Sequence, residues 1–177
     1  MTTRTDKTLK KSAPVITDKT KRGRSGLKQR VRIGRSKTSD FRLDAFKYYV
    51  DTPLNVQMTI DVIRDKLPTK LVGDAIEFLA LPKAVVLEGL RIPMSSYHRK
   101  LSGNQLLSSD ETERVMRLAE VTRLATEAFG GGVPASAWMG APNKALAGKT
   151  PLSLIDTDAG TSQVRRVLSV INYGGVL

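Results

Sequence analysis

Hydrophobic positions along this chain follow a helical period from about residue 40 onward, whereas the alternation typical of strands is scarce. Two segments, 55–67 and 68–80, each place apolar residues on neighbouring turns, and Pro68 ends the first and begins the second. The Asn-Gly and Asp-Gly dipeptides that form tight hairpin turns are absent. The pattern therefore predicts an all-α fold.

The clearest helix is predicted over 108–129. Ser108 and Glu111 have the spacing of a capping box, and a run of three glycines at 130–132 ends the apolar stripe. Segments 82–90 and 92–103 predict two shorter helices. A last helix, from about residue 158, separates an apolar face from a polar one, namely Val164, Val167, Leu168 and Ile171 against Arg165, Arg166 and Ser169.

These elements predict three parts. Residues 1–39 are rich in Lys, Arg, Thr, Ser and Gly and have too few apolar residues for a core, so we expect a disordered basic arm. Residues 54–128 are expected to form a helical domain, and residues 130–177 a small C-terminal helical domain hinged at the three glycines. No repeat of 20 to 50 residues indicates a solenoid.

Charge is concentrated in the arm. The chain has 29 Lys and Arg against 17 Asp and Glu, a net charge of +12. Residues 1–37 hold 13 of these basic residues and two of the acidic ones, so the remainder, with 16 and 15, carries a net charge of only +1. Such an arm is typical of a protein that binds a polyanion, usually nucleic acid. The alternative is a tail that only solubilises the chain.

The composition excludes several classes of protein. No cysteine is present, which excludes disulfides and cysteine-ligated metals. Apolar runs are shorter than the ~18 residues that a membrane span needs. The basic N-terminus lacks the apolar core of a secretory signal. We therefore expect a cytoplasmic protein without a membrane partner.

The letters GKT at 148–150 are those that end a nucleotide-binding phosphate loop, but their context excludes this motif. The loop requires a glycine where this chain has Asn143, and a strand before it, where the sequence predicts helix and turn. Pro151 also restricts Thr150 to extended conformations, whereas in a phosphate loop the helix begins at this position. The sequence instead predicts Thr150 as an N-cap and Pro151 as the first helical residue.

The sequence also lacks the groups of residues that form common catalytic sites. His98 is the single histidine, and no pair of carboxylates lies in an apolar pattern. We therefore predict no enzymatic activity, no cofactor, no metal site and no small-molecule substrate.

Segment 83–103 reads as helix, tight turn and helix, the length of a helix-turn-helix unit. Its second helix offers hydroxyls and cations that suit phosphates and base edges. The candidate DNA contacts are Ser95, Ser96, Tyr97, Arg99 and Lys100, and His98 lies between them on the same helix. The alternative is an ordinary solvated helix.

The C-terminal part resembles the Xre/MbcA/ParS-type antitoxins, over about 68–177 and most specifically over 138–174. That family has an Arg-Leu-Ala core in its central helix, an Ala-Trp pair, a Gly-x-Thr-Pro turn, a short helix ending in Asp-Thr and a last helix ending in Tyr-Gly. The matching residues are Arg117-Leu118-Ala119, Ala137-Trp138, Pro142-Asn143, Ala145-Leu146, Gly148, Thr150-Pro151-Leu152, Asp156-Thr157, Gly160 and Tyr173-Gly174.

The resemblance implies an antitoxin of a RES-Xre type II toxin–antitoxin system. Its helix-turn-helix would bind the operator of its own operon, and its C-terminal domain would block the active site of a RES-domain, NAD-degrading toxin. We expect a homodimer, since palindromic operators suit two-fold symmetry. The toxin contacts carried over by resemblance are Lys149, Arg165, Arg166, Asn172, Tyr173, Gly174, Val176 and Leu177.

Two departures and two alternatives accompany this resemblance. The family often has a glycine just before Ile92, where this chain has Arg91, and Pro93 replaces a Ser-like N-cap. The alternatives are a stand-alone DNA-binding regulator and an antitoxin of an acetyltransferase toxin.

The C-terminal part also has residues that we expect in the core. These are Trp138 and a cluster of four residues, Leu146, Leu152, Leu154 and Ile155. Tyr173 is expected either to cap the bundle or to enter a partner.

Overall fold

The computed structural model of the chain describes the backbone of residues 41–174 and the side chains of residues 45–174. The predicted basic arm, 1–39, and the predicted toxin contacts Val176 and Leu177 lie outside the described residues.

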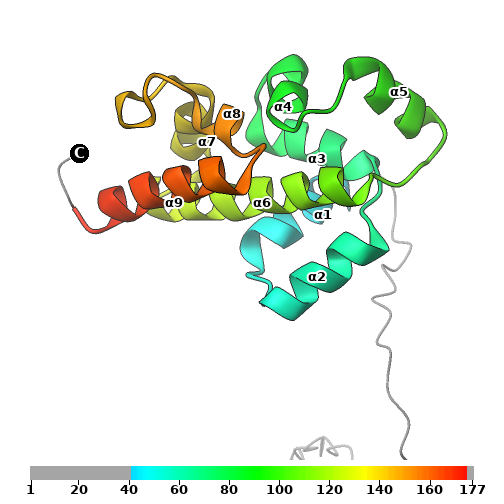
Figure 1. The fold of residues 1–177 in the computed structure, drawn as a ribbon, viewed down its shortest axis with the longest axis horizontal. Helices are drawn as coiled ribbons and strands as arrows, with labels where there is room; N and C mark the ends of the chain where they lie inside the picture. The colour runs from blue at the N-terminus through cyan, green and yellow to red at the C-terminus, as the bar shows by residue number, and fades with distance from the viewer. Residues whose placement is uncertain (1–40, 175–177) are drawn as a thin grey trace, which may run out of the picture. The chain divides into compact units, whose positions relative to one another are not determined.

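The described part is helical throughout, which confirms the predicted all-α fold (Figure 1). An isolated bridge between Pro68 and Leu106 is its one extended pairing. The helices are α1 (Phe41–Asp51), α2 (Val56–Asp65), α3 (Lys70–Leu79), α4 (Lys83–Gly89), α5 (Met94–Ser102), α6 (Ser109–Phe129), α7 (Gly132–Gly140), the 3₁₀ helix η1 (Lys144–Leu146), α8 (Pro151–Leu154) and α9 (Asp158–Asn172).

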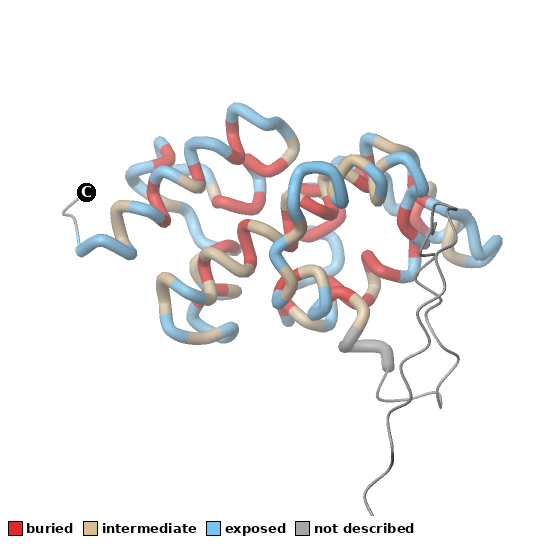
Figure 2. Tube along the Cα trace, turned by 90° about the horizontal axis from the view of Figure 1, so that it is seen from below, coloured by how far each residue is buried: buried red, intermediate tan, exposed pale blue. Residues whose placement is uncertain are grey.

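Helix α6 is the element around which the others pack. It contacts α1 and α2, which precede it, and α7 and α9, which follow it. Its inward positions, including Val115, Leu118, Val121 and Ala125, are at most 1% exposed. Figure 2 shows buried positions recurring at intervals along the helices, with exposed positions between them. The described residues, 41–174, lie in one compact unit, so segments 54–128 and 130–174 meet along α6.

Helix α1 was not part of the predicted helical domain, which begins at residue 54. It nevertheless contributes to the core, because Phe46 and Val50, one turn apart, are 0% and 2% exposed. The ring of Phe46 meets that of Phe78 in α3 edge-on, with 5.6 Å between ring centroids. The core therefore begins before residue 54, where the predicted helical domain starts.

The ends of the later helices follow the predicted capping signals. Ser108 and Glu111 form the capping box of α6, and Gly130 ends this helix with φ at +71°. The Thr150 hydroxyl accepts a hydrogen bond from the Ser153 N–H at 3.1 Å, and Pro151 is the first residue of α8. The predicted core cluster 146–155 is confirmed, because Leu146, Leu152, Leu154 and Ile155 are all buried.

None of the described helices is both long enough and apolar enough to cross a membrane.

Candidate functional site

Helix α5 presents one polar face outward. Ser95, His98, Arg99 and Ser102 are exposed, and their spacing of three, four and seven residues places them on one side of the helix. Two of them, Ser95 and Arg99, are predicted DNA contacts, and Ser96 at the edge of this face is half-buried. Hydroxyl, imidazole and guanidinium groups together suit hydrogen bonding to phosphate oxygens and base edges.

Tyr97 points the other way. It is 3% exposed, and its hydroxyl lies so close to Gly73 of α3 that a Cβ there would be 3.2 Å from it. Lys83 of α4 lies with its Nζ 6.0 Å from the ring centroid. Burial, and then the negative charges of Asp74 and Glu77, raise the pKa of the Tyr97 hydroxyl above its ordinary value. Tyr97 thus packs α5 against α3.

Lys100 also anchors α5. Its ammonium is paired with the carboxylate of Glu111 at the start of α6, and the two side chains are only 15% and 10% exposed. The same carboxylate accepts the Ser108 N–H at 2.7 Å, while the Ser108 hydroxyl accepts the Glu111 N–H at 3.1 Å. One carboxylate therefore completes the N-terminal cap of α6 and holds α5 beside it.

The ionisation of Glu111 predicts a pH dependence of stability. Burial raises its pKa, but hydrogen bonds from Lys100 and Ser108 and the charge of Lys100 together lower it below the ordinary value of 4.5. The ion pair therefore contributes stability above pH 4.5 and loses that contribution as the pH falls through the folded-state pKa.

Replacing Glu111 by glutamine should test this dependence. We expect Glu111→Gln to lower the free energy of unfolding by about 2 kcal/mol at neutral pH, because it removes a hydrogen-bonded charge. Urea unfolding of both proteins at neutral pH and below pH 4.5 should show the difference shrinking on acidification. A difference that is constant with pH would contradict the assigned role of the carboxylate.

The predicted DNA contacts are thus divided by the helix. Ser95 and Arg99 lie outward, whereas Tyr97 and Lys100 fix the position of α5. Ser102 was not among the predicted residues, although its spacing of seven from Ser95 would have placed it on the same face.

The far end of the chain presents a second exposed surface. Tyr173 follows α9 and is 88% exposed, so its ring is not buried against the described helices. Gly174 follows with φ at +68°, a conformation that favours glycine. Arg166 and Asn172 of α9 and Lys149 before α8 are exposed as well. We call residues 172–174 the tip.

Arg165 differs from these residues because it is bound within the chain. Its Nε and Nη2 donate to the two carboxylate oxygens of Glu120 in α6, at 3.0 Å and 2.6 Å. Hydrogen bonding to Glu120, followed by the charges of Glu120 and Asp158, raises the pKa of Arg165 despite partial burial. This paired geometry ties α9 to α6.

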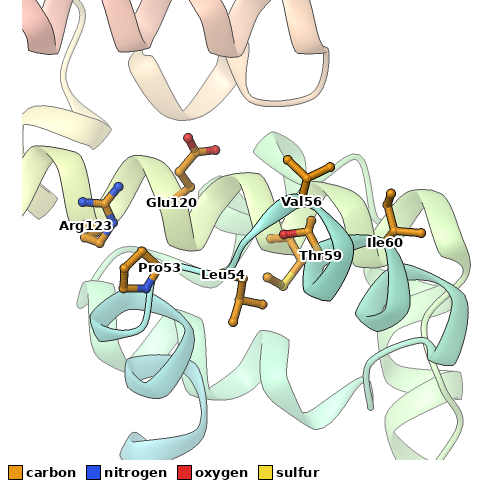
Figure 3. A pocket seen from close by; sticks show the side chains of 8 residues that line it. Pro53, Leu54, Val56, Thr59, Ile60, Glu120 and Arg123 are labelled. Carbon is orange, nitrogen blue, oxygen red and sulfur yellow. The ribbon is translucent and has the colours of Figure 1, made fainter. Parts of the chain in front are cut away.

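Glu120 lies beside a pocket of about 340 Å³ between α2 and α6. Pro53, Leu54, Val56, Thr59 and Ile60 line it from α2 and the loop before it, and Met116, Glu120 and Arg123 line it from α6. In Figure 3 the Glu120 carboxylate points away from Leu54, out of the apolar part of the pocket.

Trp138 of α7 is half-buried rather than fully enclosed. Its ring lies beside that of Phe129 at the end of α6, with 5.4 Å between ring centroids. It therefore joins the core from its edge, as expected for a large aromatic residue.

Two protein families match successive parts of the chain. Residues 58–120 match the antitoxin Xre-like helix-turn-helix domain, and residues 124–174 match the antitoxin Xre/MbcA/ParS C-terminal toxin-binding domain. The first range contains α5, and the second contains α9 and the tip.

Curated relatives carry corresponding names. An antitoxin Xre of Photorhabdus laumondii is 29% identical over 114 residues, which cover 64% of this chain and 77% of the relative. An antitoxin Xre of Pseudomonas putida is 32% identical over 83 residues, covering 47% of this chain and about half, 52%, of the relative. A Prs ADP-ribosylating antitoxin of a Sphingobium species is 28% identical over 124 residues, covering 65% of this chain and 78% of the relative.

The outward face of α5 therefore belongs to a helix-turn-helix domain, and the exposed tip belongs to a toxin-binding domain. The chain thus contains an antitoxin Xre-like helix-turn-helix domain followed by an antitoxin Xre/MbcA/ParS C-terminal toxin-binding domain, and it is similar to curated relatives named antitoxin Xre.

Proposed function

We propose that this antitoxin blocks a RES-domain, NAD-degrading toxin with its C-terminal domain and represses its own operon with its helix-turn-helix. The observation that carries the proposal is the tip, where an 88% exposed tyrosine ends the helix of a toxin-binding domain. A large, exposed aromatic side chain is the kind of anchor that fills a pocket on a partner protein.

Truncation of the tip tests the toxin half of this proposal. A chain that ends at Ile171 keeps the buried residues of α9, so it should fold, but we expect it to lose rescue of cells that express the toxin. Tyr173→Ala should weaken toxin binding by about 2 kcal/mol or more, as for an interface anchor. The matched control is Tyr48→Ala, which removes a half-exposed tyrosine from α1. Full rescue by the truncated chain would contradict blockade by the tip.

The identity of the toxin needs its own experiment. The gene neighbouring that of the antitoxin should be co-expressed, and the purified complex and the released partner should be compared for consumption of NAD. Since the Sphingobium relative is named a Prs ADP-ribosylating antitoxin, transfer of ADP-ribose should be measured beside NAD breakdown. An acetyltransferase partner would replace the RES assignment, and the absence of any partner would favour a stand-alone regulator.

The DNA half of the proposal rests on the face of α5. We propose that Ser95 and Arg99 contact phosphates or base edges, and that two copies of the chain bind a palindromic operator. Arg99 is an exposed cation in the last turn of the helix, among the hydroxyls of Ser95 and Ser102.

Arg99→Ala is expected to weaken binding to the DNA upstream of its own coding sequence by about 1–3 kcal/mol. Where Arg99 contacts a phosphate, the salt dependence of log K should also fall by about one. Arg166→Ala also removes an exposed guanidinium, from α9, and should leave DNA affinity unchanged. Equal losses in both variants would show that net charge, rather than α5, determines binding.

A further inference from the structure

The turn between α4 and α5 lies against the C-terminal part of the chain. Helices α4 and α8 contact each other, and Gly89 at the end of α4 lies directly on Leu152 of α8. A Cβ at Gly89 would lie 2.8 Å from both the Leu152 Cγ and its carbonyl oxygen. No side chain fits between them, so the turn and α8 are in direct contact.

Arg91 in this turn has a backbone conformation that is unfavourable for any residue other than glycine. Its φ is +53°, in the left-handed region that glycine occupies without cost. The resemblance to the antitoxin family leads one to expect a glycine near this place. The arginine side chain compensates by reaching Asp156, with its Nε 3.0 Å and its Nη2 2.9 Å from the same carboxylate oxygen.

Asp156 is held in a fixed position. Its side chain is 16% exposed, and it lies between α8 and α9. On one side, Arg117 of α6 donates from Nη1 to the Ile155 carbonyl at 3.2 Å. On the other side, the Thr157 hydroxyl accepts the Gly160 N–H at 3.1 Å and caps α9. The carboxylate is therefore presented to Arg91 from a rigid corner.

The turn leads directly into the DNA-facing helix. The Ile92 N–H donates to the Leu87 carbonyl at 2.9 Å, and Ile92 is 3% exposed. Arg114 of α6 donates from Nε to the Leu90 carbonyl at 2.7 Å. After Ile92, Pro93 begins the approach to α5. Arg91 thus lies in the turn from which α5 starts, directly before the buried Ile92.

We propose that Asp156, a residue of the toxin-binding domain, is a positioning residue for the DNA-facing helix, acting through Arg91. The proposal rests on the proposed DNA binding by α5. Without the carboxylate, Arg91 keeps its unfavourable backbone conformation without compensation, and the turn and the start of α5 become mobile. The C-terminal domain therefore contributes to DNA affinity without touching DNA.

A double-mutant cycle on the full chain tests this proposal. Asp156→Asn, Arg91→Gly and the double variant should be compared, with Asp158→Asn as the control, since Asp158 is exposed and lies near Arg165. Hydrogen exchange at the Ile92 amide reports on the turn. Affinity for a duplex taken from immediately upstream of the coding sequence, and for a random-sequence duplex, reports on α5. The urea unfolding midpoint reports on the whole chain.

We expect Asp156→Asn to speed exchange at Ile92 and to weaken affinity for the upstream duplex, each by roughly three- to tenfold, with an unfolding midpoint near that of the control. In the Arg91→Gly background the same substitution should change neither quantity, because glycine needs no compensation at this φ. This rescue separates positioning from a general loss of stability.

The proposal would be overturned if Asp156→Asn left exchange at Ile92 unchanged. It would also be overturned if the effects of the two substitutions simply multiplied in the double variant, or if exchange became faster while DNA affinity stayed the same. A wild-type chain that binds neither duplex would instead overturn the proposed DNA function. Exchange at Ile92 would still decide in that case whether Asp156 fixes the turn.

Discussion

Replacing Gly160 by alanine is expected to destabilise the folded chain by about 3 kcal/mol, the upper part of the range for overpacked sites. A Cβ at this position, in the first turn of α9, would lie 2.1 Å from the Leu154 carbonyl oxygen and 3.0 Å from its carbonyl carbon. These are backbone atoms that a rotamer change cannot move away. The methyl group would therefore force α8 and α9 apart.

The result should appear as a lower midpoint in urea unfolding, together with loss of toxin binding as the corner between α8 and α9 opens. Gly132→Ala is the matched control, because a Cβ at the first residue of α7 meets nothing within 4 Å. Alanine there should be neutral or slightly stabilising, since it reduces the entropy of the unfolded chain. Equal midpoints for the two variants would contradict the close packing of α9 on α8.

Phe46→Ala should have an effect of similar size. The side chain is 0% exposed and packs edge-on against Phe78, so its removal should cost about 3–5 kcal/mol in the free energy of unfolding. Tyr48→Ala, two residues away and half exposed, removes an aromatic ring from the same helix and should cost far less. Urea unfolding of the two variants compares them directly. Similar small losses would mean that α1 is not part of the folded core.

The hydrophobic pattern predicted the helices that carry local signals. The capping box of α6, its glycine end and the Thr150 cap of α8 are encoded within a few residues, and the structure has all three. Helix α1 has no such signal. Its described buried residues are limited to Phe46 and Val50, and their burial depends on α3 and α6, which come later in the sequence. A helix stabilised by distant neighbours is hard to predict from its own sequence.

The candidate site was predicted in part for a similar reason. Six consecutive residues of α5, 95–100, carry suitable polar groups, but a helix of 3.6 residues per turn cannot turn all of them outward. Which of these residues point outward and which point inward depends on Glu111 and on the groups around Tyr97. No local pattern in the sequence reveals these contacts. The pairing of Arg165 with Glu120 joins residues 45 positions apart, so the sequence alone showed Arg165 as a free cation on α9.

Helix α6 has a consequence for how the chain is degraded in a cell. Its inward residues support helices of both domains, so neither domain keeps a complete core once α6 unfolds. A protease that captures the unfolded chain would therefore end the proposed repression and the proposed toxin inhibition in a single event, rather than release a fragment that retains one of them. The lifetimes of the two activities are thus coupled by one helix.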